Sequence, residues 1–397
     1  MASAATPPPP VDVDAAIIGG GIAGLWLLNL LNMRGYRTLL FEAHTLGGGQ
    51  TLASQGMIHG GLKYALSGRL TGASEAIATM PARWRDCLDG RGPVNLQGLP
   101  LLSEHYYMYA APTTLGKLAG FFASKALRGR IEKLTPSEYP AALQAFDGVV
   151  YRLNDFVMDT SALLEALREP VAHLAYQHQV RPEHLQRAAT GWRISTPRAT
   201  IHARQLILCA GTGSAPLLEV LSGERSGMQT RPLHQVIVRH PQLGPFYAHC
   251  LTGITRPEPR LTITAHRDPL SSNWLWYLGG QLATDGVGMG EAALIEHARA
   301  ELQICAPWID WRGASFDTLR VDRAEPAQAQ ARRPDEAFAQ LIDASILCWP
   351  TKLSLAPDLG DRVLGLLAPP TTSGRDKLPQ LDLPAAQTGQ PPWVASG

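Results

Sequence analysis

Residues 14–43 read DAAIIGGGIAGLWLLNLLNMRGYRTLLFEA, and this stretch decides the fold. The short apolar run at 15–18 has the composition of a buried parallel strand. A helical pattern follows, and Gly35 stands where glycine favours the end of a helix. A second apolar run at 38–41 ends in Glu42. The order of strand, glycines, helix, strand and acid predicts a βαβ unit of an α/β fold.

The glycines between the first strand and the helix have the spacing G-x-G-x-x-G, at Gly19, Gly21 and Gly24. The first allows a tight turn, the second lets the backbone approach a pyrophosphate, and the third lets the helix pack close to the strand. The N-terminus of the helix stabilises the anion. Glu42 stands where an acid accepts hydrogen bonds from an adenosine ribose. The sequence therefore predicts a dinucleotide site, the alternative being a glycine-rich turn in some other βαβ unit.

The amino-acid composition limits which classes of protein the chain can belong to. A chain of 397 residues predicts two domains or one large one, and 45% hydrophobic with 17% charged residues is typical of a globular enzyme. A net charge of +1 gives no basic field for nucleic-acid binding. The five cysteines are scattered and form no C-x-x-C pair, which favours reduced thiols in a cytoplasmic protein and predicts neither a disulfide framework nor a metal site.

Three segments fall outside this pattern. Residues 1–10 carry four consecutive prolines and predict a disordered leader rather than a secretory signal. Residues 371–397 are rich in proline and small polar residues and predict an irregular tail. Residues 115–130 are apolar on one side and basic on the other, which fits either a membrane-surface helix or, as we favour, a helix with a solvated basic face.

The nucleotide domain is interrupted in the sequence. A nicotinamide-binding domain continues its strand–helix alternation, but the segment after Glu42 is glycine-rich and without such rhythm. A strand, a turn of small residues and a helix start reappear only at 203–221, and the same logic recurs at 344–367. A nucleotide domain in three pieces favours a flavoprotein.

Three motifs together carry a family resemblance. The glycine motif, LILCAGTGS at 206–214 and LAPDLG at 355–360 resemble the FAD-dependent oxidoreductases of the D-amino acid oxidase and glycine oxidase family. In addition, IHGGLKYAL at 58–66 is similar to a segment of the flavin-dependent glycerol-3-phosphate dehydrogenases. The resemblance implies a Rossmann-like FAD-binding domain and a second, substrate-binding domain built on a mixed or antiparallel sheet. The expected boundaries are 11–80, 148–222 and 315–370 for the FAD domain, and 81–147 and 223–314 for the substrate domain.

The resemblance also predicts which residues contact FAD. The segment 50–57 can track the cofactor, since its polar groups suit the pyrophosphate, and the following Gly60 and Gly61 allow the chain to lie close to the flavin ring. The predicted FAD-binding residues are Gly19, Gly21, Ile22, Ala23, Gly24, Glu42, Ala43, Gly49, Gln50, Thr51, Ser54, Gln55, Gly56, Met57, Val180, Ala210, Gly211, Thr351, Lys352 and Leu353.

Candidate catalytic residues follow from the same resemblance. His59 is the candidate base, with a structural histidine as the alternative. Lys63 and Tyr64 stand where the glycerophosphate enzymes have arginine and tyrosine. Lysine lacks the bidentate fork that suits a phosphate, which weakens the case for glycerol 3-phosphate itself. A strand end with one solvated side chain is an equal alternative for both.

The candidate anchor for a substrate carboxylate is Arg320. The family pattern of a following proline and aspartate–glycine turn is missing after it, so Arg323 is a rival, and an ordinary surface arginine is the alternative.

The last motif departs from the family. A glycine-rich turn usually precedes LAP and gives backbone N–H groups to the flavin, but this chain reads CWPTKLSLAP at 348–357. Lys352 can supply positive charge there instead, whereas Pro350 removes a donor. Cys348 is a conceivable covalent flavin link, and a buried strand cysteine is the favoured interpretation.

Three hypotheses for function remain open. The first is an FAD-dependent oxidase or dehydrogenase of a small amino acid or secondary amine, reoxidised by oxygen or a quinone. The second is a dehydrogenase of an α-hydroxy acid or a glycerol-3-phosphate-like substrate. The third is a flavin-binding subunit with little activity of its own, favoured by the altered CWPTKLSLAP motif. All three predict FAD, and the first two a small-molecule substrate and an electron acceptor.

Overall fold

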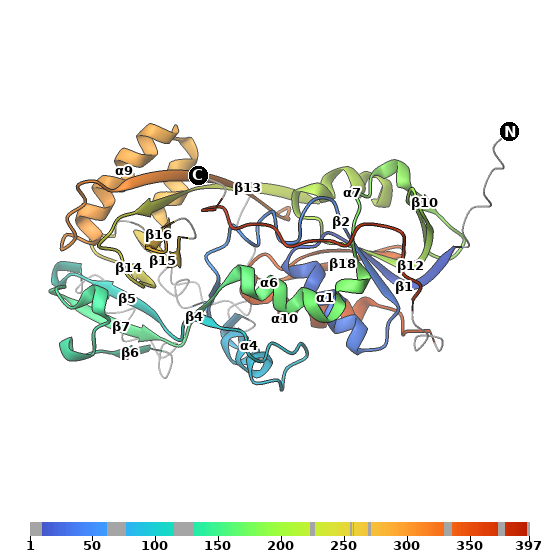
Figure 1. The fold of residues 1–397 in the computed structure, drawn as a ribbon, viewed down its shortest axis with the longest axis horizontal. Helices are drawn as coiled ribbons and strands as arrows, with labels where there is room; N and C mark the ends of the chain where they lie inside the picture. Colours follow the sequence, from blue (N-terminus) through green and yellow to red (C-terminus); the bar gives the residue numbers. More distant parts are fainter. Residues whose placement is uncertain are drawn as a thin grey trace.

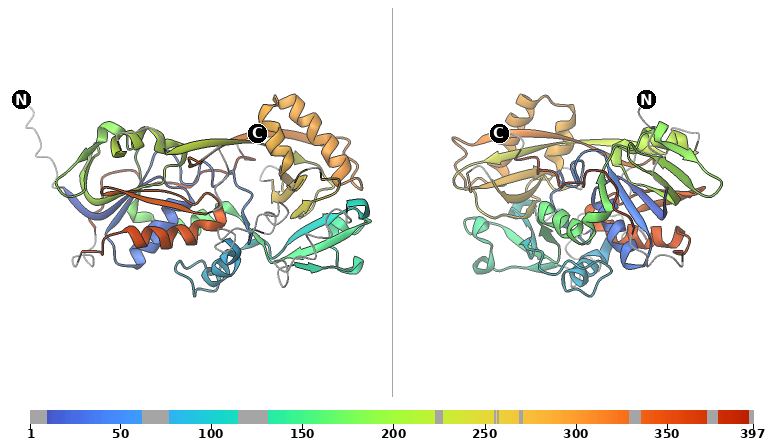
Figure 2. Two further views of the ribbon diagram at one scale, coloured as in Figure 1. Left: turned by 180° about the vertical axis from the view of Figure 1, so that it is seen from behind. Right: turned by 45° about the vertical axis from the view of Figure 1, so that its right-hand side comes forward.

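The computed structural model describes residues 10–61, 77–114, 131–222, 227–254, 256, 258–268, 271–328, 336–371 and 378–394. Two lobes, each built on an eight-stranded sheet, lie side by side (Figures 1 and 2). The predicted leader, apart from Pro10, and the basic segment 115–130 lie outside the described residues.

The first sheet is the predicted nucleotide-binding sheet. Its order is β10-β11-β12-β1-β2-β9, with β19 also beside β12 and β18 beside β19. The run from β19 through β12, β1 and β2 to β9 is parallel. Its strands come from three separated parts of the chain, as predicted. They are β1 (Val11–Ile18), β2 (Thr38–Glu42), β9 (Ala175–Gln177), β10 (Leu185–Arg187), β11 (Trp192–Ser195), β12 (Thr200–Leu208), β18 (Phe338–Ile342) and β19 (Ser345–Trp349).

Helices pack on this sheet. The first of them, α1, follows the glycine turn and ends just before Gly35, as the sequence predicts, and Gly35 has a left-handed φ of 79°. Most of α1 is buried, because α6 and α10 cover it on the side away from the sheet. Asn29 in its middle is satisfied, since its amide donates to the carbonyls of Leu25 and Leu167. The helices of this lobe are α1 (Ile22–Met33), α4 (Met80–Leu88), α6 (Thr160–Arg168), α7 (Ser214–Ser222) and α10 (Ala356–Leu366).

The second sheet has the order β17-β13-β16-β15-β14-β5-β7-β6. It is antiparallel except where β14 pairs with β5, so it is mixed, as predicted. Helix α9 (Glu291–Cys305) shares its apolar core, and short α8 (Gln281–Asp285) follows β16. The strands are β5 (Tyr106–Ala110), β6 (Ile131–Lys133), β7 (Val149–Leu153), β13 (Met228–Arg239), β14 (Ala248–Cys250), β15 (Leu261–Arg267), β16 (Trp274–Gly279) and β17 (Ser315–Pro326).

The sheets divide the chain at slightly different points from the sequence pattern. Both β7 and β17 hydrogen-bond into the second sheet, although the ranges 148–222 and 315–370 place them in the FAD domain. The long strands β13 and β17 run together from the second sheet toward the first lobe, and in Figure 1 β13 spans the top of the molecule. A small third sheet of β3 (Met57–Ile58), β8 (Phe156–Met158) and β4 (Leu101–Ser103) lies at the junction.

The tail at 378–394 forms no helix or regular strand, but it contacts both lobes. On the first lobe it makes isolated bridges to Leu46 and Tyr176. Near its end, the Trp393 ring packs against His266 and Tyr277 of the second sheet, with ring centroids 4.1 and 5.8 Å apart. The tail is therefore a strap between the lobes. No helix among the described residues is long and apolar enough to cross a membrane.

Candidate functional site

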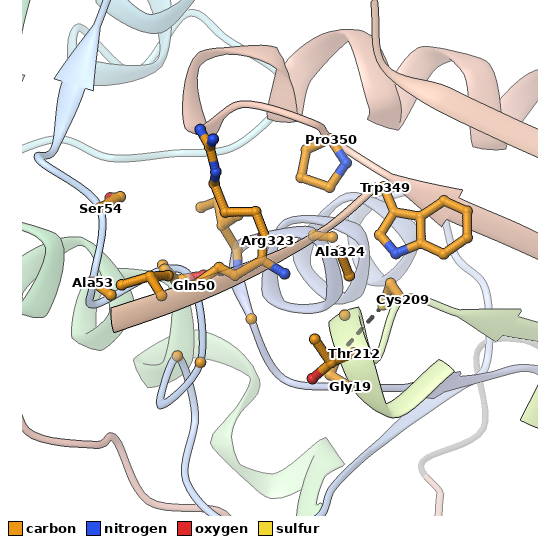
Figure 3. Close-up of a pocket in the computed structure, with 18 of the residues that line it drawn as sticks. Gly19, Gln50, Ala53, Ser54, Cys209, Thr212, Arg323, Ala324, Trp349 and Pro350 are labelled. Atoms are coloured by element: carbon orange, nitrogen blue, oxygen red, sulfur yellow. Dashed lines mark hydrogen bonds between the residues drawn. The ribbon is translucent and has the colours of Figure 1, made fainter. Parts of the chain in front are cut away.

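A cavity of about 990 Å³ lies between the two lobes. All the predicted FAD-binding residues except Gly24 line it. Figure 3 looks into it, with Gly19, Gln50 and Ser54 of the first lobe and Arg323 of β17 labelled. We call the part lined by 18–23, 42–51, 178–182 and 209–217 the nucleotide end, and the part lined by β13, β17 and 349–353 the substrate end.

The glycines of the nucleotide end make a cradle. Gly19 has a left-handed φ of 109°, and a Cβ there would lie 2.6 Å from the Ala210 Cα. A Cβ on Gly24 would lie 1.9 Å from the Gly19 carbonyl oxygen, so Gly24 serves helix packing and not the cavity wall. A Cβ on Gly21 would have one neighbouring atom within 4 Å, the Thr51 hydroxyl oxygen at 3.2 Å. A side chain at position 21 would therefore press on the Thr51 hydroxyl, whereas glycine leaves the backbone accessible to a pyrophosphate.

Side chains fix this turn. The Glu42 carboxylate accepts from the backbone N–H groups of Gly20 at 2.6 Å and of His44 at 2.9 Å. The Thr51 hydroxyl accepts from the Ile22 N–H, at the first turn of α1, at 3.0 Å. Glu42 thus orders the glycine turn and also lines the cavity at the end of β2, where a ribose is expected.

The irregular segment 50–57 joins the two lobes along the cavity. The Gln55 amide donates to the carbonyls of Thr262 and Tyr277 in the second sheet, at 3.0 and 2.9 Å. The Tyr277 hydroxyl donates back to the Ala53 carbonyl at 2.9 Å. Gly56 has a φ of 66°, and a Cβ there would lie 2.1 Å from the Met158 carbonyl oxygen. The Gln55 amide and the Tyr277 hydroxyl therefore hold the segment against the second sheet, which the sequence did not show.

At the substrate end, two strands present alternate side chains to the cavity. In the antiparallel pair β13–β17, Arg231 lies opposite Arg323 and Leu233 opposite Val321. These four residues and Gln235 line the cavity. Neighbouring strand residues point to opposite faces of a sheet. These two strands therefore bring two arginines to the cavity, of which Arg231 was not predicted from the sequence.

Arg320 is not brought to this site. It lies one strand position from Val321, is exposed, and donates to the Val287 carbonyl at 3.1 Å. The sequence-based assignment of the carboxylate anchor to Arg320 therefore loses its support, because the strand register turns that side chain away from the cavity. Its rival Arg323 lines the cavity and donates from Nε to the Arg231 carbonyl at 3.3 Å.

A buried carboxylate supports the arginines. Glu325 is 2% exposed and accepts from Arg231 Nε at 2.8 Å and from Arg231 Nη2 at 3.0 Å, a bidentate pair. The Gln229 amide donates to the same carboxylate at 2.9 Å. Burial alone raises the pKa of Glu325, but the Arg231 and Gln229 hydrogen bonds and the charges of Arg231 and Arg323 outweigh it and lower that pKa.

His59 is buried and lines the cavity. Its backbone N–H donates to the Ser354 hydroxyl at 3.0 Å, and its Nδ1 accepts from the Gly61 N–H at 3.2 Å. In a neutral imidazole, an accepting Nδ1 places the proton on Nε2. With its proton on Nε2, a neutral His59 would donate a hydrogen bond from that atom, and its role as a base stays a prediction.

The turn after β19 keeps an unusual backbone. Thr351 has a left-handed φ of 60°, which a glycine adopts far more easily, and its hydroxyl donates to the Glu336 carbonyl at 2.8 Å. The next residue, Lys352, is 8% exposed and lines the cavity beside Pro350. Cys348 is buried in β19 and is not a lining residue, so the cavity gives no support to a covalent flavin link there. Lys63 and Tyr64 lie outside the described residues.

A glycine cradle on a parallel sheet, a cavity of about 990 Å³ beside it and a second sheet at the far end of that cavity are the features expected of an FAD-dependent oxidoreductase. The model of the family "FAD dependent oxidoreductase" (DAO) matches residues 14–273, and the chain belongs to this family. It uses FAD and acts on a small-molecule substrate with an electron acceptor.

Relatives agree with this assignment. The chain is 46% identical to the probable FAD-dependent oxidoreductase PA4991 of Pseudomonas aeruginosa over 394 residues. This match covers 97% of the chain and 98% of the relative. The crystal structure of that protein superimposes with a TM-score of 0.82 over 98% of this chain and 99% of the other. Glycine oxidase from Geobacillus kaustophilus shares the fold, with a TM-score of 0.62 and 19% identity, over 91% of this chain and 96% of the other.

A shorter part of the chain is similar to a second kind of dehydrogenase. Glycerol-3-phosphate dehydrogenase 1 of Mycobacterium tuberculosis is 34% identical over 121 residues. That match covers 29% of this chain and 22% of the other, so it describes one part of the molecule only.

Proposed function

We propose that this protein is an oxidase or dehydrogenase of a small amino acid or secondary amine that carries a carboxylate. The observation that supports this most directly is Arg323, which faces the cavity from the second sheet beside Arg231. Arginine binds carboxylates with two parallel hydrogen bonds, which fixes the orientation as well as the position of a substrate. In this proposal Arg323 takes over the role that the sequence assigned to Arg320.

The bound FAD would accept the hydride removed from the substrate carbon next to nitrogen. The chain's own residues position the substrate for that event. Arg323 holds the carboxylate, and Gln55 keeps the segment 50–57 against the second sheet. His59 donates from Nε2, and the buried Lys352 supplies positive charge. The imine product would then hydrolyse in water.

A second candidate is an α-hydroxy-acid or glycerol-3-phosphate-like substrate. It is favoured by the local similarity to glycerol-3-phosphate dehydrogenase 1 and by IHGGLKYAL. Against it stands the pairing of Arg231 with Glu325, which leaves less positive charge for a phosphate. Oxygen or a quinone would reoxidise the flavin in either case. All five cysteines are buried and free of disulfides, which supports our proposal of a cytoplasmic protein.

The test is anaerobic mixing of the FAD-loaded protein with a panel of glycine, N-methyl amino acids, proline, hydroxy acids and glycerol 3-phosphate. We expect the flavin absorbance near its visible maximum to bleach with one or more of the amino or imino acids. Bleaching by glycerol 3-phosphate or hydroxy acids alone would favour the second candidate. A flavin that dithionite reduces but no substrate bleaches would contradict both and favour a binding subunit.

A further inference from the structure

The two arginines of the substrate end share one buried carboxylate. Arg231 and Arg323 are directly opposite each other on β13 and β17, and Glu325 stands two residues beyond Arg323 on the same strand face. Glu325 binds Arg231 through both of its oxygens, at 2.8 and 3.0 Å. Two guanidinium groups and one carboxylate leave a single net positive charge in this cluster.

This arrangement is built rather than incidental. Glu325 is 2% exposed, so its charge is shielded little by solvent and needs its partners. The Gln229 amide adds a third hydrogen bond at 2.9 Å, and the charge of Arg323 also lowers the pKa of Glu325. The carboxylate therefore stays ionised and offsets one guanidinium at any pH near neutrality.

We infer that Glu325 determines substrate specificity: it leaves the arginine pair with one net positive charge, so the site accepts a single carboxylate and rejects dianions such as phosphate esters and dicarboxylates. This rests on the proposed function in placing the substrate's anionic group at Arg323. Specificity by charge depends as much on repulsion of the wrong ligand as on attraction of the right one.

Other charges lining the cavity do not change the comparison. Arg256 lines it and is paired with Asp285, through a contact on the molecular surface. Glu42, Arg181, Glu258 and Lys352 also line it. All these groups stay the same in the variants below, so a difference between variants reports on Glu325 and Arg231 alone.

The test uses the FAD-loaded protein, with acetate and malonate as probes at pH 8, where malonate is a dianion. Their dissociation constants are measured from the change that each anion causes in the flavin absorbance spectrum. For wild type we expect acetate to bind more tightly than malonate. In Glu325→Gln the ratio of the two constants should shift toward malonate by about tenfold, as expected for one added unit charge at a partly buried site.

Two further variants keep the test decisive if Glu325→Gln does not fold. The double variant Arg231→Gln/Glu325→Gln removes one charge of each sign, and its ratio should return to within about twofold of wild type. Glu325→Asp keeps the charge and should also keep the ratio. An unchanged ratio in folded, FAD-loaded Glu325→Gln, or a double variant that prefers malonate, would overturn the inference.

The readout separates this inference from the proposed function. Anion binding is measured without turnover, so the ratio can shift as expected even if no amine bleaches the flavin. In that case the charge selection stands and the amine substrate is wrong. Conversely, an amino acid that bleaches the flavin with an unchanged ratio in Glu325→Gln would leave the proposed function intact and overturn the role of Glu325.

Discussion

The two ends of the cavity are constructed in different ways. At the nucleotide end, glycines and backbone groups form much of the wall, and the hydrogen bonds that Glu42 and Thr51 make to the glycine turn join residues 22 and 29 positions apart. At the substrate end, charged side chains form the wall, and Arg231 meets Glu325 across 94 residues of sequence. The first end depends on the absence of side chains, and the second on strand register.

That difference predicts opposite kinds of sensitivity. At the nucleotide end, a side chain added where two backbone segments are in contact should prevent folding or FAD binding. At the substrate end, substitutions on the strand face turned away from the cavity should have little effect on ligand binding, and substitutions on the cavity face should weaken it. The following predictions test this contrast, beginning with the largest expected effect.

The first prediction concerns two glycines three residues apart. Gly24→Ala places a Cβ 1.9 Å from the Gly19 carbonyl oxygen, which is backbone and cannot move aside cheaply. We expect it to purify colourless or not to fold. Gly21→Ala meets only the Thr51 hydroxyl, at 3.2 Å, so it should fold but bind FAD less tightly. Circular dichroism and flavin content measure both, and a yellow, stable Gly24→Ala would break the contrast.

The second prediction concerns the strap. Trp393 is 6% exposed and packs against Tyr277, which also holds the Ala53 carbonyl. Trp393→Ala should lower the free energy of unfolding by about 3 kcal/mol, the usual loss for a buried aromatic. The neighbouring Val394→Ala should cost far less, because Val394 is only partly buried. Urea denaturation measures both, and equal losses would show that the strap does not depend on the ring.

The third prediction uses the alternation of β17. Arg323→Met should weaken binding of a monocarboxylate by about 100-fold, since it removes charge-assisted hydrogen bonds worth about 2–3 kcal/mol. Arg320→Met, three residues away on the other face, should change it by less than twofold. Titration of the flavin spectrum with acetate measures both. Equal effects of the two substitutions would contradict the register described here.

The fourth prediction concerns pH. Burial lowers the pKa of His266 to about 3, against about 6.5 in an unfolded chain. The folded state binds this proton less well than the unfolded chain. The contribution of His266 to the free energy of unfolding is therefore complete above pH 6.5 and is lost as the pH falls from 6.5 toward 3. At pH 5 the loss should be about 2 kcal/mol. The difference between the free energies of unfolding at pH 8 and at pH 5 should therefore be larger in wild type than in His266→Asn. Equal differences in the two proteins would contradict this prediction.

These contrasts also explain which features could be predicted from the sequence. The glycine turn with Gly19, Gly21 and Gly24 and the helix behind it could be predicted, because one short stretch of sequence carries the whole motif. The mixed second sheet was predicted as a type of structure, but its register was not. A shift of one residue on β17 decides between Arg320 and Arg323, and no spacing in a single sequence reveals it.

Two residues of the substrate end were not predicted at all, for the same reason: the strand register was unknown. Arg231 and Glu325 look like ordinary strand charges until β13 and β17 are paired. The alternation of Arg231, Leu233 and Gln235 was a usable signal, since residues two apart share a face of a strand. The tail at 378–394 was expected to be irregular, and it is, but its Trp393 is held by rings far away in the chain.

The most direct test is a crystal structure of the FAD-loaded protein with a bound small amino acid or monocarboxylate. It should show the carboxylate oxygens about 2.8 Å from the guanidinium nitrogens of Arg323, at the substrate end of the cavity. Glu325 should remain paired with Arg231. A carboxylate bound at Arg320, or outside the space between β13 and the turn at 349–353, would contradict the central claim.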